Sequence, residues 1–140
     1  MYRAHHDLVA WQISMELVKE ICDLTSSFPE SEKYGLRAQM RRAVISIPSN
    51  IAEGAARASA KEFDRYLSIA RGSLSELETQ TILAVNLGLV EEQEPLLGKI
   101  NRVFRLLNGI KTRQTYKTGE NRGIYSGTAF WSSSVFPFPF

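Results

Sequence analysis

Basic side chains at helical spacing are the main chemical signal in this sequence. Arg37 and Arg41 lie four residues apart, and Arg42 adjoins them. Side chains at this spacing share one face of a helix, and the planar guanidinium group matches the oxygens of a phosphate. This pattern indicates a surface that binds RNA or DNA through phosphates. The candidate nucleic-acid-binding residues are Arg37, Arg41, Arg42, Arg57, Lys61, Arg65, Lys99, Arg102 and Arg105.

Two groups in this set could form continuous ridges. Arg57, Lys61 and Arg65 are spaced by four residues, so they line up if the segment is helical. The segment from Lys99 to Arg113 offers a second ridge. Phosphates bind such ridges through counterion release, without base specificity.

An internal role for the arginines is the competing interpretation. Arg41 and Arg42 could pair with carboxylates, within a subunit or across a subunit interface. Removing one member of a buried ion pair costs about 3–5 kcal/mol, so such pairs would be structural. In that case Lys61, Arg65, Lys99 and Arg102, predicted to project outward, are the better phosphate ligands. The possible carboxylate partners are Glu53, Glu76 and Glu78.

A line of mixed charge accompanies one predicted helix. Asp64, Arg71 and Glu78 recur every seven residues. Such a line is usually a solvated flank, and it also serves in contacts between helices of different subunits. Both interpretations stay open. The candidate structural or oligomer residues are Pro48, Glu53, Asp64, Arg71, Glu76 and Glu78.

Catalytic and metal-binding patterns are weak. His5 and His6 fall in a segment expected to fray, and Cys22 is the single cysteine, with no nearby histidine. A di-metal site in a bundle needs Glu-x-x-His pairs, which the glutamates here do not form. Neither a glycine-rich phosphate loop nor a nucleophile elbow is present. We therefore expect no enzymatic activity, no metal and no cofactor.

Apolar periodicity predicts four long helices and no sheet. Their expected ranges are residues 8–26, 31–56, 59–87 and 91–111. Asp7 is the expected N-cap of the first helix, and Ser59 with Glu62 forms a capping box that starts the third. Gly88 is a natural terminator. Short connections between long amphipathic helices predict an all-α fold, an antiparallel up-down-up-down four-helix bundle.

Pro48 interrupts the second predicted helix. Proline lacks a backbone N–H and crowds the carbonyl four residues earlier, that of Val44. Since the apolar rhythm continues through Ile51, the sequence predicts one kinked helix rather than two helices. Neighbouring Ser49 and Asn50 can hydrogen-bond backbone groups beside the kink.

The chain changes character near Arg113. We predict a bundle domain over residues 1–113 and a flexible tail over residues 114–140. Seven of the 14 aromatic residues fall in this tail, together with Pro137 and Pro139, which oppose helix and strand. The tail could dock on an apolar surface or be an extension without function.

Charge is distributed in alternating blocks. Residues 1–32 carry a net charge of −4, residues 33–71 of +5, residues 72–98 of −5 and residues 99–140 of +6. Such blocks suggest charged faces that pair with another subunit or a polyanion. A single cysteine fits a reducing cytosol, and neither a signal peptide nor a membrane-spanning run is visible. We therefore expect a cytoplasmic protein.

Several longer motifs resemble a known family. The chain resembles the four-helix-bundle proteins encoded within intervening sequences of bacterial 23S ribosomal RNA genes, and the accessory protein of diversity-generating retroelements is similar. The resemblance covers about residues 8–113. It rests on Trp11-Gln12, Tyr34-Gly35-Leu36, Arg41-Arg42, the IPSNIAEG run over residues 47–54, Lys61-Glu62-Phe63 and the GSLSELETQ run over residues 72–80.

This resemblance implies a homopentameric ring with no established enzymatic activity. The retroelement relative associates with a reverse transcriptase and binds nucleic acid through a basic surface. We expect an accessory factor that binds structured RNA, or RNA and DNA. The alternative is a ring-shaped interaction scaffold for a partner enzyme such as a reverse transcriptase. The neighbouring genes distinguish the two: a ribosomal RNA intervening sequence favours the first, an adjacent reverse transcriptase the second.

Overall fold

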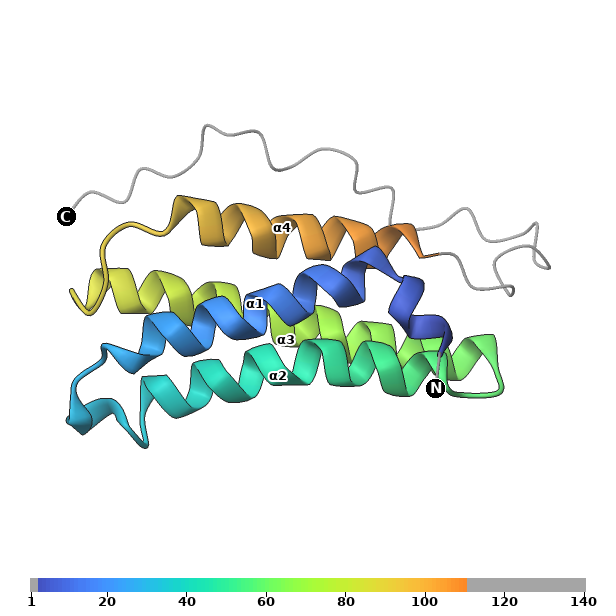
Figure 1. Ribbon diagram of the computed structural model, residues 1–140, viewed down its shortest axis with the longest axis horizontal. Helices are drawn as coiled ribbons and strands as arrows, with labels where there is room; N and C mark the ends of the chain where they lie inside the picture. The colour runs from blue at the N-terminus through green and yellow to red at the C-terminus, as the bar shows by residue number, and fades with distance from the viewer. Residues whose placement is uncertain (1–2, 111–140) are drawn as a thin grey trace, which may run out of the picture.

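Residues 3–110 are described in the computed structural model, and every regular element among them is a helix (Figure 1). The fold is therefore all-α, as predicted. Two short 3-10 helices precede α1 and α2. The elements are η1 (Ala4–Asp7), α1 (Val9–Ser26), η2 (Glu30–Glu32), α2 (Leu36–Ala55), α3 (Ala60–Asn86) and α4 (Glu94–Gly109).

The four long helices form a closed bundle in chain order. The α1 helix packs against α2 and α4, and α3 packs against the same two helices. The connections lie at alternate ends of the bundle, so consecutive helices run antiparallel (Figure 1). The predicted four-helix bundle is confirmed. The predicted tail, residues 114–140, and the last residues of the predicted bundle domain lie outside the described residues.

Aliphatic side chains from all four helices fill the core. Burying one such side chain contributes about 1.5–3 kcal/mol, so these stripes provide most of the stability. Buried hydroxyl groups bond to carbonyls of the preceding turn, as Thr25 Oγ1 does to Ile21 at 2.7 Å. The largest fully buried side chains include Leu17, Ile21, Met40, Ile47, Leu74, Leu77, Val103 and Leu107.

The α2 helix continues through Pro48, which is buried. The prediction of one helix across this proline is confirmed, whereas the kink itself stays a prediction. Ser49 Oγ donates to the carbonyl of Ile45 at 2.8 Å, and Asn50 Nδ2 donates to that of Ser46 at 2.7 Å. The predicted side-chain bonds to the backbone near the proline are thus present.

Two predicted helix boundaries are confirmed by their caps. Ser59 is the N-cap of α3, and its hydroxyl accepts from the backbone N–H of Glu62 at 3.2 Å. Gly88 follows the end of α3 with a φ of 69°, a conformation that glycine adopts without strain.

One predicted N-cap and two predicted helix starts are wrong. Asp7 ends η1, and Leu8 is the N-cap of α1 without a side-chain bond. The α2 helix starts at Leu36 rather than at residue 31, because Glu30–Glu32 form η2 and the Glu32 carboxylate accepts from the Leu36 N–H at 2.9 Å. The α4 helix starts at Glu94 rather than at residue 91.

Candidate nucleic-acid interface

Arg41 binds the last turn of α1, and Arg37 binds the loop that follows this helix. Arg41 Nε donates to Thr25 Oγ1 at 2.9 Å, and its Nη2 donates to the Cys22 carbonyl at 3.1 Å. Arg37 Nη2 donates to the Phe28 carbonyl at 2.5 Å. The C-terminal end of a helix carries partial negative charge, which favours a guanidinium group nearby. Arg41 therefore joins α2 to α1, and Arg37 joins α2 to the loop that follows α1.

These positions differ from the expectation that Arg37 and Arg41 share an exposed surface of their helix. Both are half-buried, and Arg41 bonds to the α1 residues rather than to a glutamate. Of these three arginines, only Arg42 is exposed, and within residues 3–110 it has no polar partner. The structure therefore separates two neighbouring arginines that the sequence could not distinguish.

Arg57 closes the turn between α2 and α3. Its Nη2 lies 2.7 Å from Glu53 Oε1 and donates to the Tyr66 hydroxyl at 2.6 Å. Its guanidinium carbon also lies 5.0 Å from the centroid of the Tyr66 ring. The hydrogen bond to Glu53 is the main reason that the pKa of Arg57 is raised. Because Arg57 precedes α3, it does not lie on the same helix as Lys61 and Arg65. The predicted three-residue ridge is therefore wrong, and only Lys61 and Arg65 share a helix.

The α2 and α3 helices approach each other closely at Gly54. A Cβ atom there would lie 2.6 Å from Cβ of Tyr66 and 2.9 Å from Cδ2 of Phe63, so only glycine fits without displacement. Further along, Ser46 Oγ and Ser73 Oγ lie 2.8 Å apart and hydrogen-bond across the two helices. We call this contact the α2–α3 seam. It consists of Ser46, Asn50, Glu53, Gly54, Phe63, Tyr66 and Ser73.

Lys99 turns toward α1 instead of projecting outward as predicted. Its Nζ lies 3.1 Å from Glu16 Oε2 and forms a second, shorter ion pair with Glu20. The hydrogen bond to Glu20, followed by that to Glu16, raises the pKa of Lys99. With its side chain 27% exposed, Lys99 joins α4 to α1.

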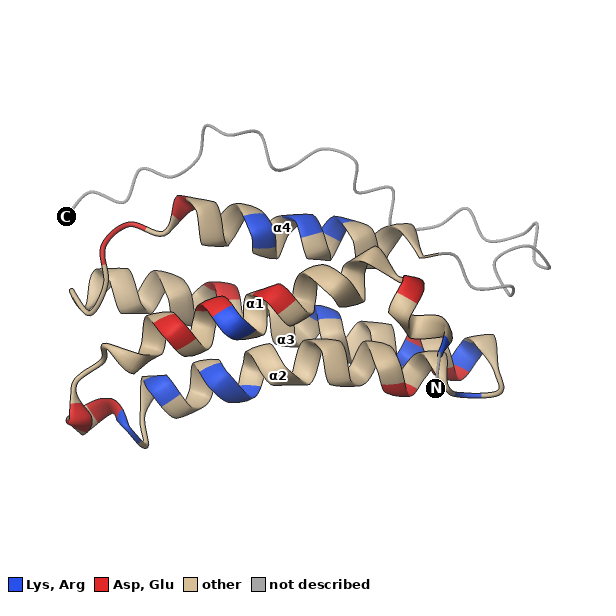
Figure 2. Ribbon diagram, viewed as in Figure 1, with Lys and Arg blue, Asp and Glu red and all other residues tan. Residues whose placement is uncertain are grey.

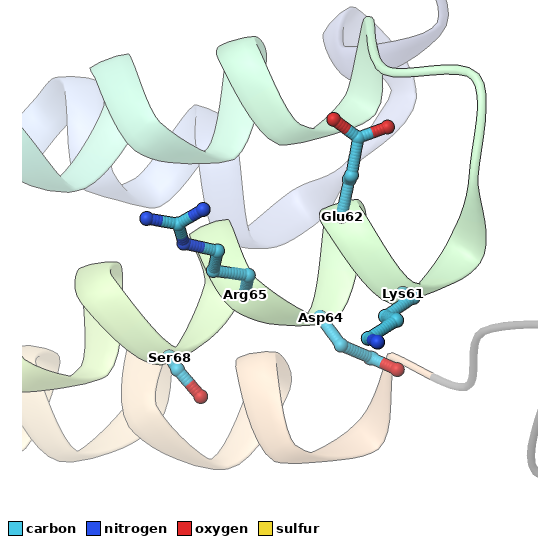
Figure 3. A pocket seen from close by; sticks show the side chains of 5 residues that line it. All are labelled: Lys61, Glu62, Asp64, Arg65 and Ser68. Carbon is cyan, nitrogen blue, oxygen red and sulfur yellow. The ribbon is translucent and has the colours of Figure 1, made fainter.

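Lys61 and Arg65 are both exposed at the start of α3, where they border an open hollow of about 600 Å³ (Figure 3). Glu62 and Asp64 line the same hollow, so its four charged groups sum to zero. Lys61 and Asp64 lie on one side of the helix, and Glu62 lies on another (Figure 3). The intervening carboxylates make this surface less favourable for a polyanion than the spacing of the basic residues suggests.

The outer side of α4 differs because it carries no carboxylate after the first residue, Glu94. Each of the other long helices exposes at least one acidic side chain. Blue segments occupy the middle of α4, and its only red segment is at its start (Figure 2). We call this surface the α4 face. It consists of the exposed residues Gly98, Asn101, Arg102, Arg105, Asn108 and Gly109.

Arg102 and Arg105 have no polar partner within residues 3–110, so their guanidinium groups are available to a ligand. The sequence prediction included both arginines but missed Asn101 and Asn108, whose amides can donate to phosphate or sugar oxygens. The absence of acidic residues from position 95 to position 110 is visible in the sequence and could have indicated this face.

The residues proposed for an oligomer contact on α3 differ in their contacts and exposure. Arg71 Nη2 donates to Ser68 Oγ at 2.8 Å, and Glu76 accepts from Gln80 Nε2 at 3.0 Å. Glu78 is half-buried and Asp64 is exposed. Their proposed role in an oligomer stays a prediction.

His5 and His6 pack on Trp11 instead of fraying. The His5 and His6 ring centroids each lie 5.2 Å from that of Trp11, and Gln12 Nε2 donates to the His6 carbonyl at 2.7 Å. Burial, together with the positive charges of His6 and Arg3, lowers the pKa of His5. Within the described part of the chain, no three metal-ligating side chains gather, and no helix is long and apolar enough to cross a bilayer.

The fold and the α4 face together define a class of protein: a small four-helix bundle with one cationic outer surface. Residues 6–109 match the family model described as 23S rRNA-intervening sequence protein. The chain belongs to this family, as the motifs in its sequence indicate. A comparison with curated proteins finds no match.

Proposed function

We propose that this protein is a non-enzymatic, cytoplasmic accessory factor that binds structured RNA, or RNA and DNA, through the α4 face. The observation that carries the proposal is the pair of exposed arginines, without a polar partner among residues 3–110, on a helix surface without carboxylates. The family description, which refers to 23S rRNA, supports RNA as the polyanion.

Arg102 and Arg105 suit the phosphate backbone for two reasons. A guanidinium group forms two parallel hydrogen bonds to a phosphate, and it needs little desolvation at an exposed site. Gly98 and Gly109 are exposed and have no side chain that projects from the helix, so a nucleic-acid backbone can approach the helix closely. Such contacts bind without strong base preference, and their affinity falls steeply with salt.

The test is binding of a labelled RNA hairpin by the purified full chain across a salt series. Changing Arg102 and Arg105 together to glutamate should lower affinity about tenfold or more and reduce the salt dependence. The matched control changes Lys19 and Lys33 to glutamate, because both are exposed and lie outside the α4 face. Equal loss in both double variants would show a response to net charge alone and would contradict a specific α4 face.

Lys61 and Arg65 provide an internal comparison. We expect their double reversal to glutamate to weaken binding less than reversal of the α4 arginines, because Glu62 and Asp64 already offset their charge. A larger loss would place the interface at the start of α3 instead of on α4.

The family resemblance also supports assembly as a homopentamer. Aliphatic side chains remain exposed on α2 and α3, with Ile45 at 49%, Ile69 at 43% and Leu83 at 44% exposure. A subunit contact would bury them. Light scattering tests the assembly, and Pro48→Ala tests whether the proline shapes it: an unchanged mass would assign Pro48 no role in assembly.

The same exposed aliphatic residues favour the second candidate function, a ring-shaped scaffold for a partner enzyme such as a reverse transcriptase. A ring that does not bind RNA even at low salt would support this alternative. A reverse transcriptase encoded next to this chain would identify the partner to test.

A further inference from the structure

The ion-pair cluster beside the α4 face has an electrostatic consequence for any polyanion that binds there. Lys99 contacts Glu16 and Glu20 of α1, whose side chains are 62% and 43% exposed. Lys99 precedes Arg102 by one helical turn, which brings their Cβ atoms to about 5–6 Å. The two carboxylates meet the Lys99 ammonium group, which is carried one helical turn before Arg102, so we infer that their charge acts on the same part of α4.

Lys99 is poorly placed to bind a phosphate itself. Its ammonium group already bonds to two carboxylates, and its side chain is 27% exposed. If it moved to a phosphate, it would leave Glu16 and Glu20 uncompensated next to that phosphate. Like charges at this separation repel, so the gain from the new contact would be offset.

We propose that Lys99 is a positioning residue for polyanion binding: it keeps the Glu16 and Glu20 carboxylates of α1 paired and neutralises part of their charge. This inference rests on the proposed function of the α4 face. With Lys99 present, the three groups sum to a charge of −1. Without it the sum is −2, beside the two arginines that bind phosphate.

The experiment measures RNA-hairpin affinity of the full chain at low and physiological salt. Lys99→Met should weaken binding about fivefold at low salt, with a smaller effect as salt screens the carboxylates. Adding Glu16→Gln and Glu20→Gln to that variant should restore binding to about the wild-type level or better. The matched control, Lys19→Met, removes a lysine that pairs with Asp23 on the solvent side of α1 and should change affinity less than about twofold.

The triple variant separates charge compensation from two other roles. If Lys99 bound phosphate directly, or acted only by pinning α4 to α1, the triple variant would bind as weakly as Lys99→Met. Either result would overturn the inference. Helicity and thermal midpoint, measured on every variant, show whether each one folds.

If Lys99→Met fails to fold, the double variant Glu16→Gln, Glu20→Gln still provides a test. It retains Lys99 and should bind RNA about fivefold more tightly than the wild type at low salt, because the local charge rises from −1 to +1. Unchanged affinity would contradict the inference while leaving the role of Arg102 and Arg105 intact. A folded wild-type protein that does not bind RNA at any salt would overturn both proposals.

Discussion

The α2–α3 seam and the α4 face both combine polar residues with glycine, but they use them in opposite ways. In the seam, each polar side chain forms a hydrogen bond within the chain, and Gly54 permits contact between two helices. On the α4 face, the arginines have no partner within residues 3–110, and nothing lies within 4 Å of a Cβ added at Gly98. The seam holds the bundle together, and the α4 face is available to a ligand.

This difference explains what the family motif contributes. The IPSNIAEG run contains Asn50, Glu53 and Gly54, all of which act in the seam. The motif that carries the resemblance is therefore mainly a helix-packing motif. The proposed ligand surface lies on α4, outside the runs by which the family was first identified.

The largest expected difference between the two regions is at glycine. Gly54→Val should lower the free energy of unfolding by about 2–3 kcal/mol, because the new side chain would overlap Tyr66 and Phe63. Gly98→Ala should raise it by about 0.5–1 kcal/mol, since alanine is the better helix former and the site is open. Urea denaturation of both variants measures the contrast. If the two substitutions changed the free energy of unfolding equally, α2 and α3 would not be in close contact at Gly54.

Two adjacent arginines test the same contrast between side chains that are hydrogen-bonded within the bundle and side chains that are exposed to solvent. Arg41→Met should cost about 1.5–3 kcal/mol of stability, because it removes charged hydrogen bonds to Thr25 and the Cys22 carbonyl. Arg42→Met, next in sequence but exposed, should change stability by less than about 0.5 kcal/mol. Thermal denaturation followed by circular dichroism distinguishes the two. A stable Arg41→Met protein would argue against its contact with α1.

A smaller effect is expected at the asparagines. Asn50→Ala should cost about 1 kcal/mol, because Asn50 Nδ2 bonds to both the carbonyl and Oγ of Ser46. Asn101→Ala on the α4 face should leave stability unchanged. If Asn101→Ala destabilises the protein as much as Asn50→Ala, the α4 face has internal contacts and is less available than we propose.

The smallest expected effect is a pH dependence outside both regions. The pKa of His5 is lowered below its ordinary value of 6.5 by burial, His6 and Arg3. As the pH falls through 6.5, the unfolded chain takes up a proton that the folded chain resists, so stability decreases. Above that pH the histidine is neutral in both states and contributes no such dependence. In His5→Gln, the decrease measured by urea denaturation in mildly acidic buffer should be smaller, and an identical decrease would assign it to other groups.

The number of helices, their core stripes and two of their boundaries could be predicted from the sequence because they follow from local physics. Leu74 and Leu77 lie on the buried face by their spacing, and Ser59 caps α3 through a bond three residues away. The predicted start of α2 lies too early in the chain, because the turn formed by η2 and the Glu32 carboxylate has no strong periodic signal.

The four amphipathic helices follow from the apolar periodicity of the chain, and its motifs indicate the family. Which cations are available depends instead on how the helices pack. Arg37, Arg41, Arg57 and Lys99 bond to groups that are 4 to 83 residues away in the chain, whereas Arg102 and Arg105 face solvent. Helical spacing places a side chain on a face, but the neighbouring helix decides whether that side chain has a partner.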